Sequence, residues 1–339
     1  MTHARPITAA RALALALTAT LLAAPGLLPD AEAKERKPAA APVPSEMALY
    51  AQQIDFTSTV NQRPYRILVS IPARPAPPEG HPVVYLIDGN LHFGIAVDTA
   101  RIQSRWPDLR DPVIVGIGYQ TASVSEALML RMIDLTTPVT PAYLSKGWIA
   151  EMKSKAEEFG GMDAYLRMID EEIKPRVEKL AKIDRNNQTL MGHSLGGLTT
   201  LHALFRRPGS FQQYVSISPS IWWDERSVLE HEPAFTSQVK AGGIKARLLI
   251  SVGGLESANR AYPPGMPYSR EGMYAMFDAT RMVPNTVELG TRLQRLNSDV
   301  FHVETVVHEG DDHNMVPPAG IARGIWFTQR IPVETRGAR

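Results

Sequence analysis

Short runs of apolar residues recur along the chain from about residue 53, and longer segments with helical spacing separate most of them. Several runs are continuously apolar, which is typical of strands buried on both faces of a mostly parallel sheet. The first two runs follow each other too closely for a helix between them, so we expect an antiparallel hairpin at one edge. In chain order the runs are QIDFTSTV, YRILVSI, VVYLI, VIVGI, QTLMG, YVSIS, ARLLISV and HVETVV.

Helical periodicity is clearest in residues 163–180, where Tyr165, Ile169 and Ile173 recur at a spacing close to 3.6 residues. Strands that alternate with helices predict a doubly wound α/β domain, with a mostly parallel eight-stranded sheet and helices on both faces. We see no internal repeat and no break in composition after residue 53, so we place one domain at residues 53–335.

The N-terminus has a different pattern. Basic residues precede the apolar run ALALALTATLLAAPGLL, and a small-x-small cleavage pattern follows at residues 31–33. We therefore predict a secretory signal peptide over residues 1–33. The alternative is an uncleaved membrane anchor, but Pro25 interrupts the run, which is also shorter than the roughly 20 residues of a membrane span. Residues 34–52 are rich in Pro and Ala and are predicted to form a disordered linker.

Composition narrows the function classes. Of the 339 residues, 44% are hydrophobic and 21% charged, and the net charge is +1. These values fit a globular domain without the clustered basic residues of a nucleic-acid-binding protein, so we expect no nucleic-acid partner. The chain has no cysteine, which excludes disulfides, thiolate metal sites and a catalytic thiol. The sequence leaves the oligomeric state open.

One motif carries a specific chemistry. Residues 192–196 read Gly-His-Ser-Leu-Gly, directly after an apolar strand pattern and directly before a helical pattern. This is the G-x-S-x-G nucleophile elbow in the strand, turn and helix context that it requires. The sharp turn lifts the hydroxyl of Ser194 out of the sheet, and glycines let the strand and helix backbones approach closely. The motif predicts a serine nucleophile on an α/β-hydrolase fold.

A serine hydroxyl needs a base, and in this fold the acid and the histidine follow the serine in the chain. His313 lies just beyond the last strand pattern, at the carboxyl ends of the strands where active sites of open α/β sheets lie. It is our candidate base, with His308 as the alternative. His202 falls within the helical pattern after the elbow, and we expect a packed or surface residue there.

The candidate acid is Glu256, because it follows the strand pattern ARLLISV and two glycines that let the chain turn. It would hold the tautomer of His313 and stabilise the imidazolium ion. Asp224 and Asp299 are weaker rivals, and a serine-histidine dyad without an acid remains an alternative.

An acyl-transfer site also needs two backbone N–H groups directed at the oxyanion. One is expected from Leu195, and the other from Asn90, in the sequence Asp-Gly-Asn that follows VVYLI. The alternative for this second loop is a plain tight turn. Residues 119–161 form a longer, partly irregular segment, which is either a short lid insertion over the strand ends or a structural loop.

The segment VVHEGDDHNMV gathers five side chains that could bind a metal ion, from His308 to His313. The two histidines are five residues apart with no helix start between them, which does not match a histidine pair on one helical face. We therefore predict no metal and no cofactor, and we expect only His313 to take part in the chemistry.

Seven segments together resemble a known family, the "putative esterase" branch of the α/β-hydrolases, and within it the esterases of trilactone siderophores, which hydrolyse enterobactin and salmochelin. The resemblance covers residues 53–330, and its most specific part is GHSLGG followed by SPSIWW. In chain order the segments are VVYLIDGN, PVIVGIGY, RMIDLTTP, FGGMDAYLRMIDEEIKP, LMGHSLGGL, SPSIWW and GDDHNMV.

The resemblance implies roles for individual residues: Ser194 is the nucleophile, His313 the base, and Asn90 and Leu195 the oxyanion donors. The related mycolyltransferases carry a glutamate after the corresponding strand, which supports Glu256, although some siderophore esterases are described as dyads. Exported members of the group act in the periplasm, so the resemblance implies a periplasmic enzyme for iron acquisition.

The implied substrate is a catecholate trilactone, as the iron complex or as the free ligand. Because a ferric tris-catecholate is anionic, Arg131 is predicted to bind it, and an ion pair with Asp134 is the alternative. Trp222 and Trp223 are predicted to stack on catechol rings, or else to pack behind the elbow.

Two further hypotheses remain. The first is an esterase or acyltransferase for other acyl groups, such as feruloyl esters, with the same chemistry and a different pocket. The second is a siderophore-binding protein without turnover, against which the complete set of Ser194, Glu256 and His313 argues.

Overall fold

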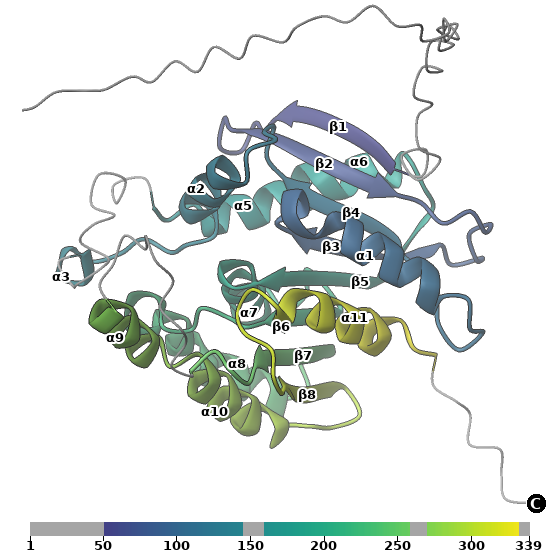
Figure 1. Ribbon diagram of the computed structural model, residues 1–339. Helices are drawn as coiled ribbons and strands as arrows, with labels where there is room; N and C mark the ends of the chain where they lie inside the picture. Colours follow the sequence, from purple (N-terminus) through teal and green to yellow (C-terminus); the bar gives the residue numbers. More distant parts are fainter. Residues whose placement is uncertain (1–50, 145–158, 258–269, 332–339) are drawn as a thin grey trace, which may run out of the picture. The chain divides into compact units, whose positions relative to one another are not determined.

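The computed structural model describes residues 51–144, 159–257 and 270–331. The predicted signal peptide (1–33) and nearly all of the predicted linker (34–52) lie outside these ranges. Eight strands form one sheet in the order β1-β2-β4-β3-β5-β6-β7-β8 (Figure 1). The strands are β1 (Ala51–Thr57), β2 (Pro64–Ser70), β3 (His81–Ile87), β4 (Val113–Gly118), β5 (Ile183–His193), β6 (Gln213–Ile217), β7 (Ala246–Gly253) and β8 (Phe301–His308).

The six strands β4, β3, β5, β6, β7 and β8, in this order across the sheet, are parallel to one another. At one edge β1 and β2 form an antiparallel hairpin, and β2 also pairs antiparallel with β4. The predicted α/β fold and its edge hairpin are therefore confirmed. The first strand begins at Ala51, two residues before the expected start of the domain.

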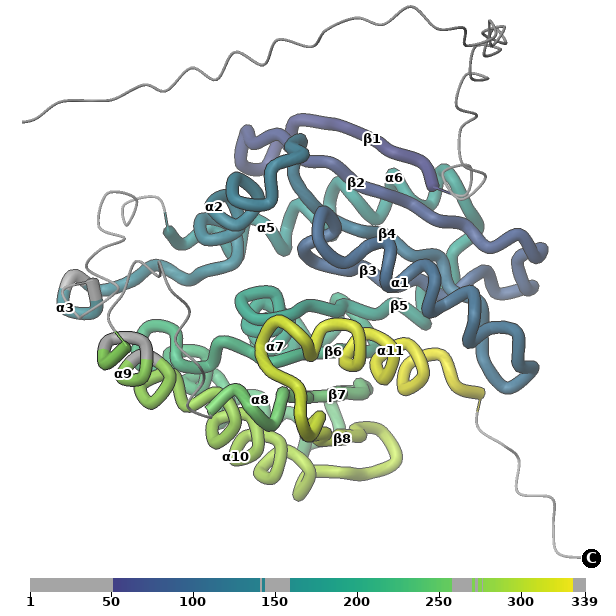
Figure 2. The backbone as a smooth tube through the Cα atoms, in the orientation of Figure 1, coloured from purple at the N-terminus to yellow at the C-terminus, as the bar shows by residue number. Residues whose placement is uncertain are grey.

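Helices cover both faces of the sheet. α1 and α11 lie side by side on one face (Figures 1 and 2), and α5, α7, α8 and α10 lie against the other. The helical elements are α1 (Gly89–Gln103), α2 (Val124–Asp134), α3 (Pro141–Leu144), α5 (Met162–Met168), η3 (Ile169–Ile173), α6 (Lys174–Glu178), α7 (Leu195–Arg206), η4 (Trp223–His231), α8 (Glu232–Lys240), α9 (Arg270–Thr280), α10 (Met282–Gln294) and α11 (Val316–Gln329).

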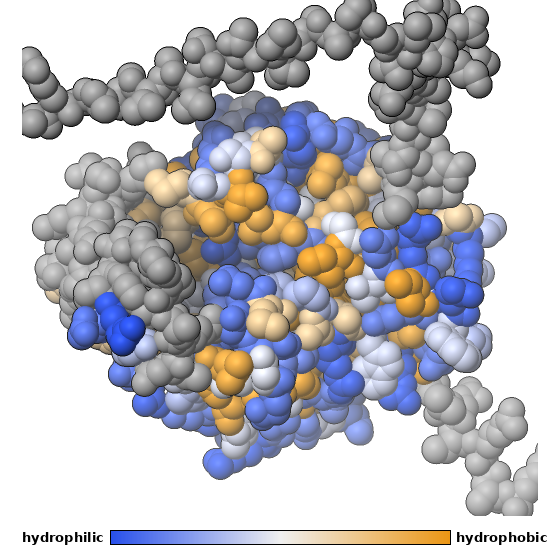
Figure 3. All heavy atoms as spheres, in the orientation of Figure 1, coloured by the Kyte–Doolittle hydropathy of each residue, from blue (hydrophilic) through white to orange (hydrophobic). Residues whose placement is uncertain are grey.

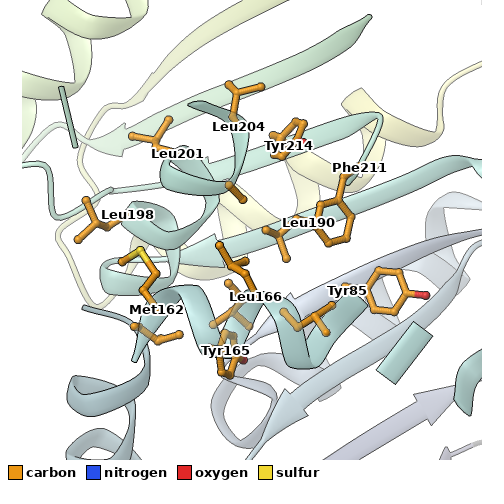
Figure 4. Packing of buried hydrophobic residues seen from close by; sticks show 14 of the residues in the cluster. Tyr85, Met162, Tyr165, Leu166, Leu190, Leu198, Leu201, Leu204, Phe211 and Tyr214 are labelled. Atoms are coloured by element: carbon orange, nitrogen blue, oxygen red, sulfur yellow. The ribbon is translucent and has the colours of Figure 1, made fainter. Parts of the chain in front are cut away.

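Alternating residues of the central strands supply both cores. Val84 and Leu86 of β3 pack beneath α1 and α11, while Tyr85 points to the opposite face, as the two-residue period of a strand requires. Figure 4 shows this second core, in which side chains of α5 and α7 meet those of β3 and β5. Every residue of α7 from Leu195 to Phe205 is buried, so the helix that begins directly after Ser194 has a fixed position.

The predicted helix at residues 163–180 is present as α5, η3 and α6 in succession. Its middle part, η3, is a wider π-helical turn, in which the N–H group of Lys174 donates to the carbonyl of Ile169, five residues back. Pro175 follows directly and has no N–H group to donate, so the altered bonding pattern accompanies a proline that would interrupt a regular helix.

The segment at residues 119–161 is less irregular than expected, because α2 forms within it. The hydroxyl of Ser123 accepts a hydrogen bond from the N–H group of Glu126 and so caps this helix. Residues 145–158, where a lid was one interpretation, lie outside the described ranges. Within those ranges no helix is long and apolar enough to cross a membrane. On the face shown in Figure 3, hydrophobic side chains lie in separate groups among hydrophilic ones.

Candidate active site

Ser194 occupies a strained turn between β5 and α7. Its φ of 61° and ψ of −117° lie in a region that residues other than glycine rarely adopt. A Cβ atom on Gly192 would lie 2.4 Å from the backbone of Gly196, so only glycine permits this crossing of strand and helix. The N–H group of Ser194 donates to the carbonyl of Ile217 on β6 at 2.9 Å, which fixes the turn to the sheet.

His313 lies beside the serine, in the loop between β8 and α11. Its Nε2 atom is 3.0 Å from Oγ of Ser194, and its Nδ1 atom is 2.7 Å from Oε2 of Glu256. An ionised Glu256 accepts the Nδ1 proton, which leaves Nε2 free to accept the proton of the serine hydroxyl. The three predicted residues thus form one hydrogen-bonded chain, and this chain can move a proton from the serine to the imidazole.

Glu256 is 3% exposed, and its carboxylate accepts two further hydrogen bonds. Its Oε1 atom accepts from the N–H group of Gly253 at 2.7 Å and from the hydroxyl of Ser218 at 2.5 Å. These donors satisfy a buried charge that would otherwise be costly to desolvate. The loops that carry the acid and the base are also joined, since the N–H group of Leu255 donates to the carbonyl of Asp311 at 3.0 Å.

The N-termini of α1 and α7 lie close to Ser194. Leu195 is the first residue of α7, and Asn90 is the second of α1, and the first N–H groups of a helix have no partner within it. The side chain of Asn90 bonds to the chain beyond β4: Oδ1 accepts from the N–H group of Tyr119 at 2.7 Å, and Nδ2 donates to the carbonyls of Tyr119 and Thr121, both at 3.0 Å. These bonds hold the residue that would supply the second oxyanion donor against the segment that follows β4.

The prediction that Arg131 binds substrate is contradicted by its position. Its side chain is buried, and Nε and Nη2 each donate to one carboxylate oxygen of Asp88 at 2.9 Å. Nη2 also donates to the carbonyl of His193 at 3.1 Å. The alternative, a pair with Asp134, is wrong as well, because that carboxylate accepts from Arg63 and from the hydroxyl of Tyr65.

The two tryptophans have different surroundings. Trp223 is 1% exposed, and its ring packs edge-on against Tyr143 and Phe159, so the prediction that it stacks on a substrate ring is wrong. Trp222 is half-buried, with its ring centroid 5.9 Å from that of Trp223, and remains a candidate for substrate contact.

His193, the residue between Gly192 and Ser194, lies beside the candidate base, although no sequence motif predicts a role for it. Its ring centroid lies 4.5 Å from that of His313 and 5.7 Å from that of His92. Burial, followed by the charge of His313, lowers the pKa of His193 well below its usual value, so its ring is neutral. A neutral ring beside the base does not repel the imidazolium form of His313.

The remaining candidates lie elsewhere. His202 is buried and bonds to Asp163 at 2.8 Å, as expected of a packed residue. Asp299 lies just before β8, at the opposite edge of the sheet from Ser194. The carboxylate of Asp312 accepts hydrogen bonds from the N–H groups of Asn314 and Met315, which lie two and three residues further along the chain, and so stabilises its own turn. In the described ranges no group of three or more histidine or carboxylate side chains is arranged to hold a metal ion.

Ser218, which donates to Glu256, is a second residue of the candidate site that the sequence interpretation missed. It directly follows β6, the strand between those that lead to Ser194 and to Glu256, so its place at the carboxyl edge was available as a signal. However, no sequence motif distinguishes Ser218 from the nearby Ser220. The Oγ atom of Ser220 lies 3.4 Å from that of Ser194.

Comparison with known proteins identifies the family. The family model described as "Putative esterase" matches residues 58–264, more than half of the chain. The chain belongs to this family. It is a carboxylic ester hydrolase, and the resemblance found in its sequence is confirmed.

Relatives of this esterase have named substrates. Ferri-bacillibactin esterase BesA of Bacillus subtilis is 34% identical over 277 residues, covering 80% of this chain and 87% of the relative. Siderophore enterobactin esterase of Emericella nidulans is 32% identical over 282 residues, covering 79% and 90%. Among solved structures, siderophore hydrolase EstA from Aspergillus nidulans matches with a TM-score of 0.72 and 29% identity, covering 85% of this chain and 97% of that one.

Proposed function

We propose that this esterase hydrolyses the ester bonds of a trilactone catecholate siderophore through an acyl-enzyme, with Ser194 as nucleophile, His313 as base and Glu256 as orienting acid. The observation that carries the proposal is the hydrogen-bonded chain from Ser194 to Glu256 in a protein whose relatives are named siderophore esterases. The complete chain favours a triad over a dyad.

In the first half-reaction, Oγ of Ser194 attacks the ester carbonyl carbon while its proton passes to Nε2 of His313. The N–H groups of Leu195 and Asn90 stabilise the negative charge that forms on the carbonyl oxygen. Glu256 stabilises the imidazolium ion. The tetrahedral intermediate then collapses: the bond to the leaving oxygen breaks, and His313 returns the proton to that oxygen.

In the second half-reaction, water takes the place of the alcohol. His313 accepts one proton of the water, the resulting oxygen attacks the acyl carbon, and collapse of the second intermediate returns the proton to Oγ of Ser194. The products are a carboxylic acid and the free serine. A trilactone has three such bonds, so repeated turnover yields first a linear trimer and then shorter units.

The test uses purified protein with iron-free and iron-loaded enterobactin, and mass spectrometry of the linear products. We expect hydrolysis that Ser194→Ala lowers by about 10⁴-fold or more, because the nucleophile is removed. Feruloyl and acetyl nitrophenyl esters serve as comparison substrates. If neither form of enterobactin is hydrolysed in a Ser194-dependent way while these esters are, the substrate is wrong and the mechanism stands.

We also infer export to the periplasm and a role in iron acquisition. The N-terminal pattern of basic residues, apolar run and small-x-small site supports export, and the relatives named as siderophore esterases support the role in iron acquisition. N-terminal sequencing of protein recovered from the periplasm is expected to begin at Lys34. Protein that is found only in the cytoplasm with its full N-terminus would contradict export.

A further inference from the structure

A cavity lies at the edge of the sheet opposite the candidate active site. Its volume is about 650 Å³, within the range of small-molecule sites. Gln213, Arg247 and His302 stand in one row at the amino ends of β6, β7 and β8, whereas Ser194 follows the carboxyl end of β5. The C-terminus of α11 closes one side, where an isolated bridge pairs Leu109 with Arg330.

The lining of this cavity has an excess of positive charge. Arg110, Lys245, Arg247 and Arg330 line it, and among the lining residues that the structure describes Asp299 is the only carboxylate. Within the described ranges none of these four cations forms an ion pair with a carboxylate. The C-terminus of a helix supplies only about half a negative charge. A net positive charge of more than two units therefore remains in the cavity.

Arg247 is a cation of this cavity that is partly removed from solvent. Its side chain is half-buried, with the guanidinium carbon 4.3 Å from the centre of the Phe327 ring, and its nearest acceptor is Oε1 of Gln213 at 3.5 Å. Burial, opposed by the charge of Glu304 and assisted by that of Arg110, lowers the pKa of Arg247. A cation that is desolvated without a bonded carboxylate is unfavourable unless an anion occupies the space in front of it.

The base of the cavity is polar but uncharged. The amide of Gln213 donates to the amide oxygen of Asn187, and both side chains are buried, 6% and 9% exposed. Amides in this position can exchange hydrogen bonds with hydroxyl groups. The cavity thus offers cations for an anionic group and amides for a polar, uncharged part of the same ligand.

We propose that this cavity binds a phosphorylated small molecule, with Arg110, Lys245, Arg247 and Arg330 around the phosphate. Guanidinium groups match phosphate oxygens in geometry as well as in charge, and a dianionic group would balance the excess that the lining carries. The same phosphate chemistry occurs in free solutes and in lipid headgroups, so the experiment has one arm for each source.

In the first arm, calorimetry measures binding of inorganic pyrophosphate and of glucose 6-phosphate at 0.15 M salt, with glucose as the uncharged comparison. In the second arm, co-sedimentation measures binding to vesicles of anionic phospholipid against vesicles of neutral phospholipid. We expect binding in at least one arm, with glucose and neutral vesicles inactive. Absence of binding in both arms would overturn the proposal.

The decisive variant is Lys245→Gln combined with Arg330→Gln, because both side chains are exposed and can be replaced without disturbing the core. The matched control, Lys240→Gln with Arg105→Gln, removes the same charge from exposed positions that do not line the cavity. We expect binding at least ten-fold weaker in the first variant and unchanged in the second, with ester hydrolysis unaffected in both. Equal loss in both variants would mean non-specific charge attraction and would refute the site.

Discussion

One buried carboxylate holds together the residues of the candidate active site. Glu256 accepts hydrogen bonds from His313, from Gly253 and from Ser218, and so connects the end of β7 with the segments that follow β6 and β8. If any of these donors is removed, the carboxylate loses part of the interaction that fixes its direction. The position of the imidazole then depends on fewer contacts, and the proton transfer that needs it becomes slower.

We predict that Ser218→Ala lowers kcat by about ten-fold and changes KM little. The hydroxyl bonds to a charged acceptor, an interaction worth about 1.5 to 3 kcal/mol, and it acts on the orientation of the base rather than on substrate binding. Steady-state kinetics with a nitrophenyl ester measures the effect, and urea unfolding confirms that the variant folds.

The control for this prediction is Ser216→Ala. Ser216 is also buried on β6, but its hydroxyl donates to the carbonyl of Gly197 rather than to the acid. We expect a loss of stability with nearly unchanged kcat. If both variants lowered kcat equally, the hydroxyl of Ser218 would have only a packing role.

At the scale of elements, one ion pair connects the three segments that meet at the nucleophile. Asp88 precedes α1, Arg131 lies in the last turn of α2, and the same guanidinium donates to His193 at the end of β5. The pair is almost fully enclosed, with side-chain exposures of 9% and 4%. It therefore fixes the loop of the second oxyanion donor relative to the elbow.

We predict that Arg131→Met destabilises the fold by about 3 to 5 kcal/mol, because it leaves the carboxylate of Asp88 buried and unpaired. The control is Arg66→Met, which breaks the exposed pair with Asp55 and is expected to cost less than about 1 kcal/mol. Urea unfolding at pH 7 measures both.

The double variant Arg131→Met with Asp88→Asn separates charge from packing. Because it removes both charges together, we expect it to recover most of the lost stability. A double variant as unstable as Arg131→Met alone would show that packing of the guanidinium, and not the unpaired charge, causes the loss.

These elements also show what the sequence can and cannot predict. Helical spacing suggested Asp134 as the partner of Arg131, but the actual partner, Asp88, lies 43 residues away. Local periodicity predicts which residues share a helix face, whereas the neighbour of that face is decided by tertiary packing. Trp223 is buried by the same kind of long-range packing, which a tryptophan pair in the sequence does not reveal.

At the scale of the whole molecule, the alternation of strands and helices was sufficient to predict the eight strands and their class. The strand order then brought Ser194, Glu256 and His313 together, because each follows the carboxyl end of a parallel strand. Position at that edge is the reason why three residues far apart in sequence could be predicted as one site. No comparable sequence signal marks His92 and His193, the buried histidines next to this site.

The two buried histidines His92 and His193 make the stability of the folded protein depend on pH. Burial lowers the pKa of His92 and, to a greater extent, that of His193, so both rings bind a proton less readily in the folded protein than in the unfolded chain. In the unfolded chain their pKa returns to about 6.5. Above that pH both states are neutral and the stability is fully present. As the pH falls below 6.5 the unfolded chain takes up protons that the folded protein does not, and stability is lost.

We therefore predict that the free energy of unfolding decreases between pH 6.5 and pH 5.5, and that each of these two histidines contributes up to about 1.4 kcal/mol per pH unit. Urea unfolding at a series of pH values measures the slope of the free energy of unfolding against pH.

His193→Gln removes one titrating group. The slope of this variant should therefore be smaller than that of the unmodified protein, whatever stability the variant loses at pH 7. Asn285→Ala, at a buried position without a titrating group, is the control and should keep the original slope. An unchanged slope in His193→Gln would mean that this ring is protonated in the folded protein, and that the base at Ser194 then operates beside a second positive charge.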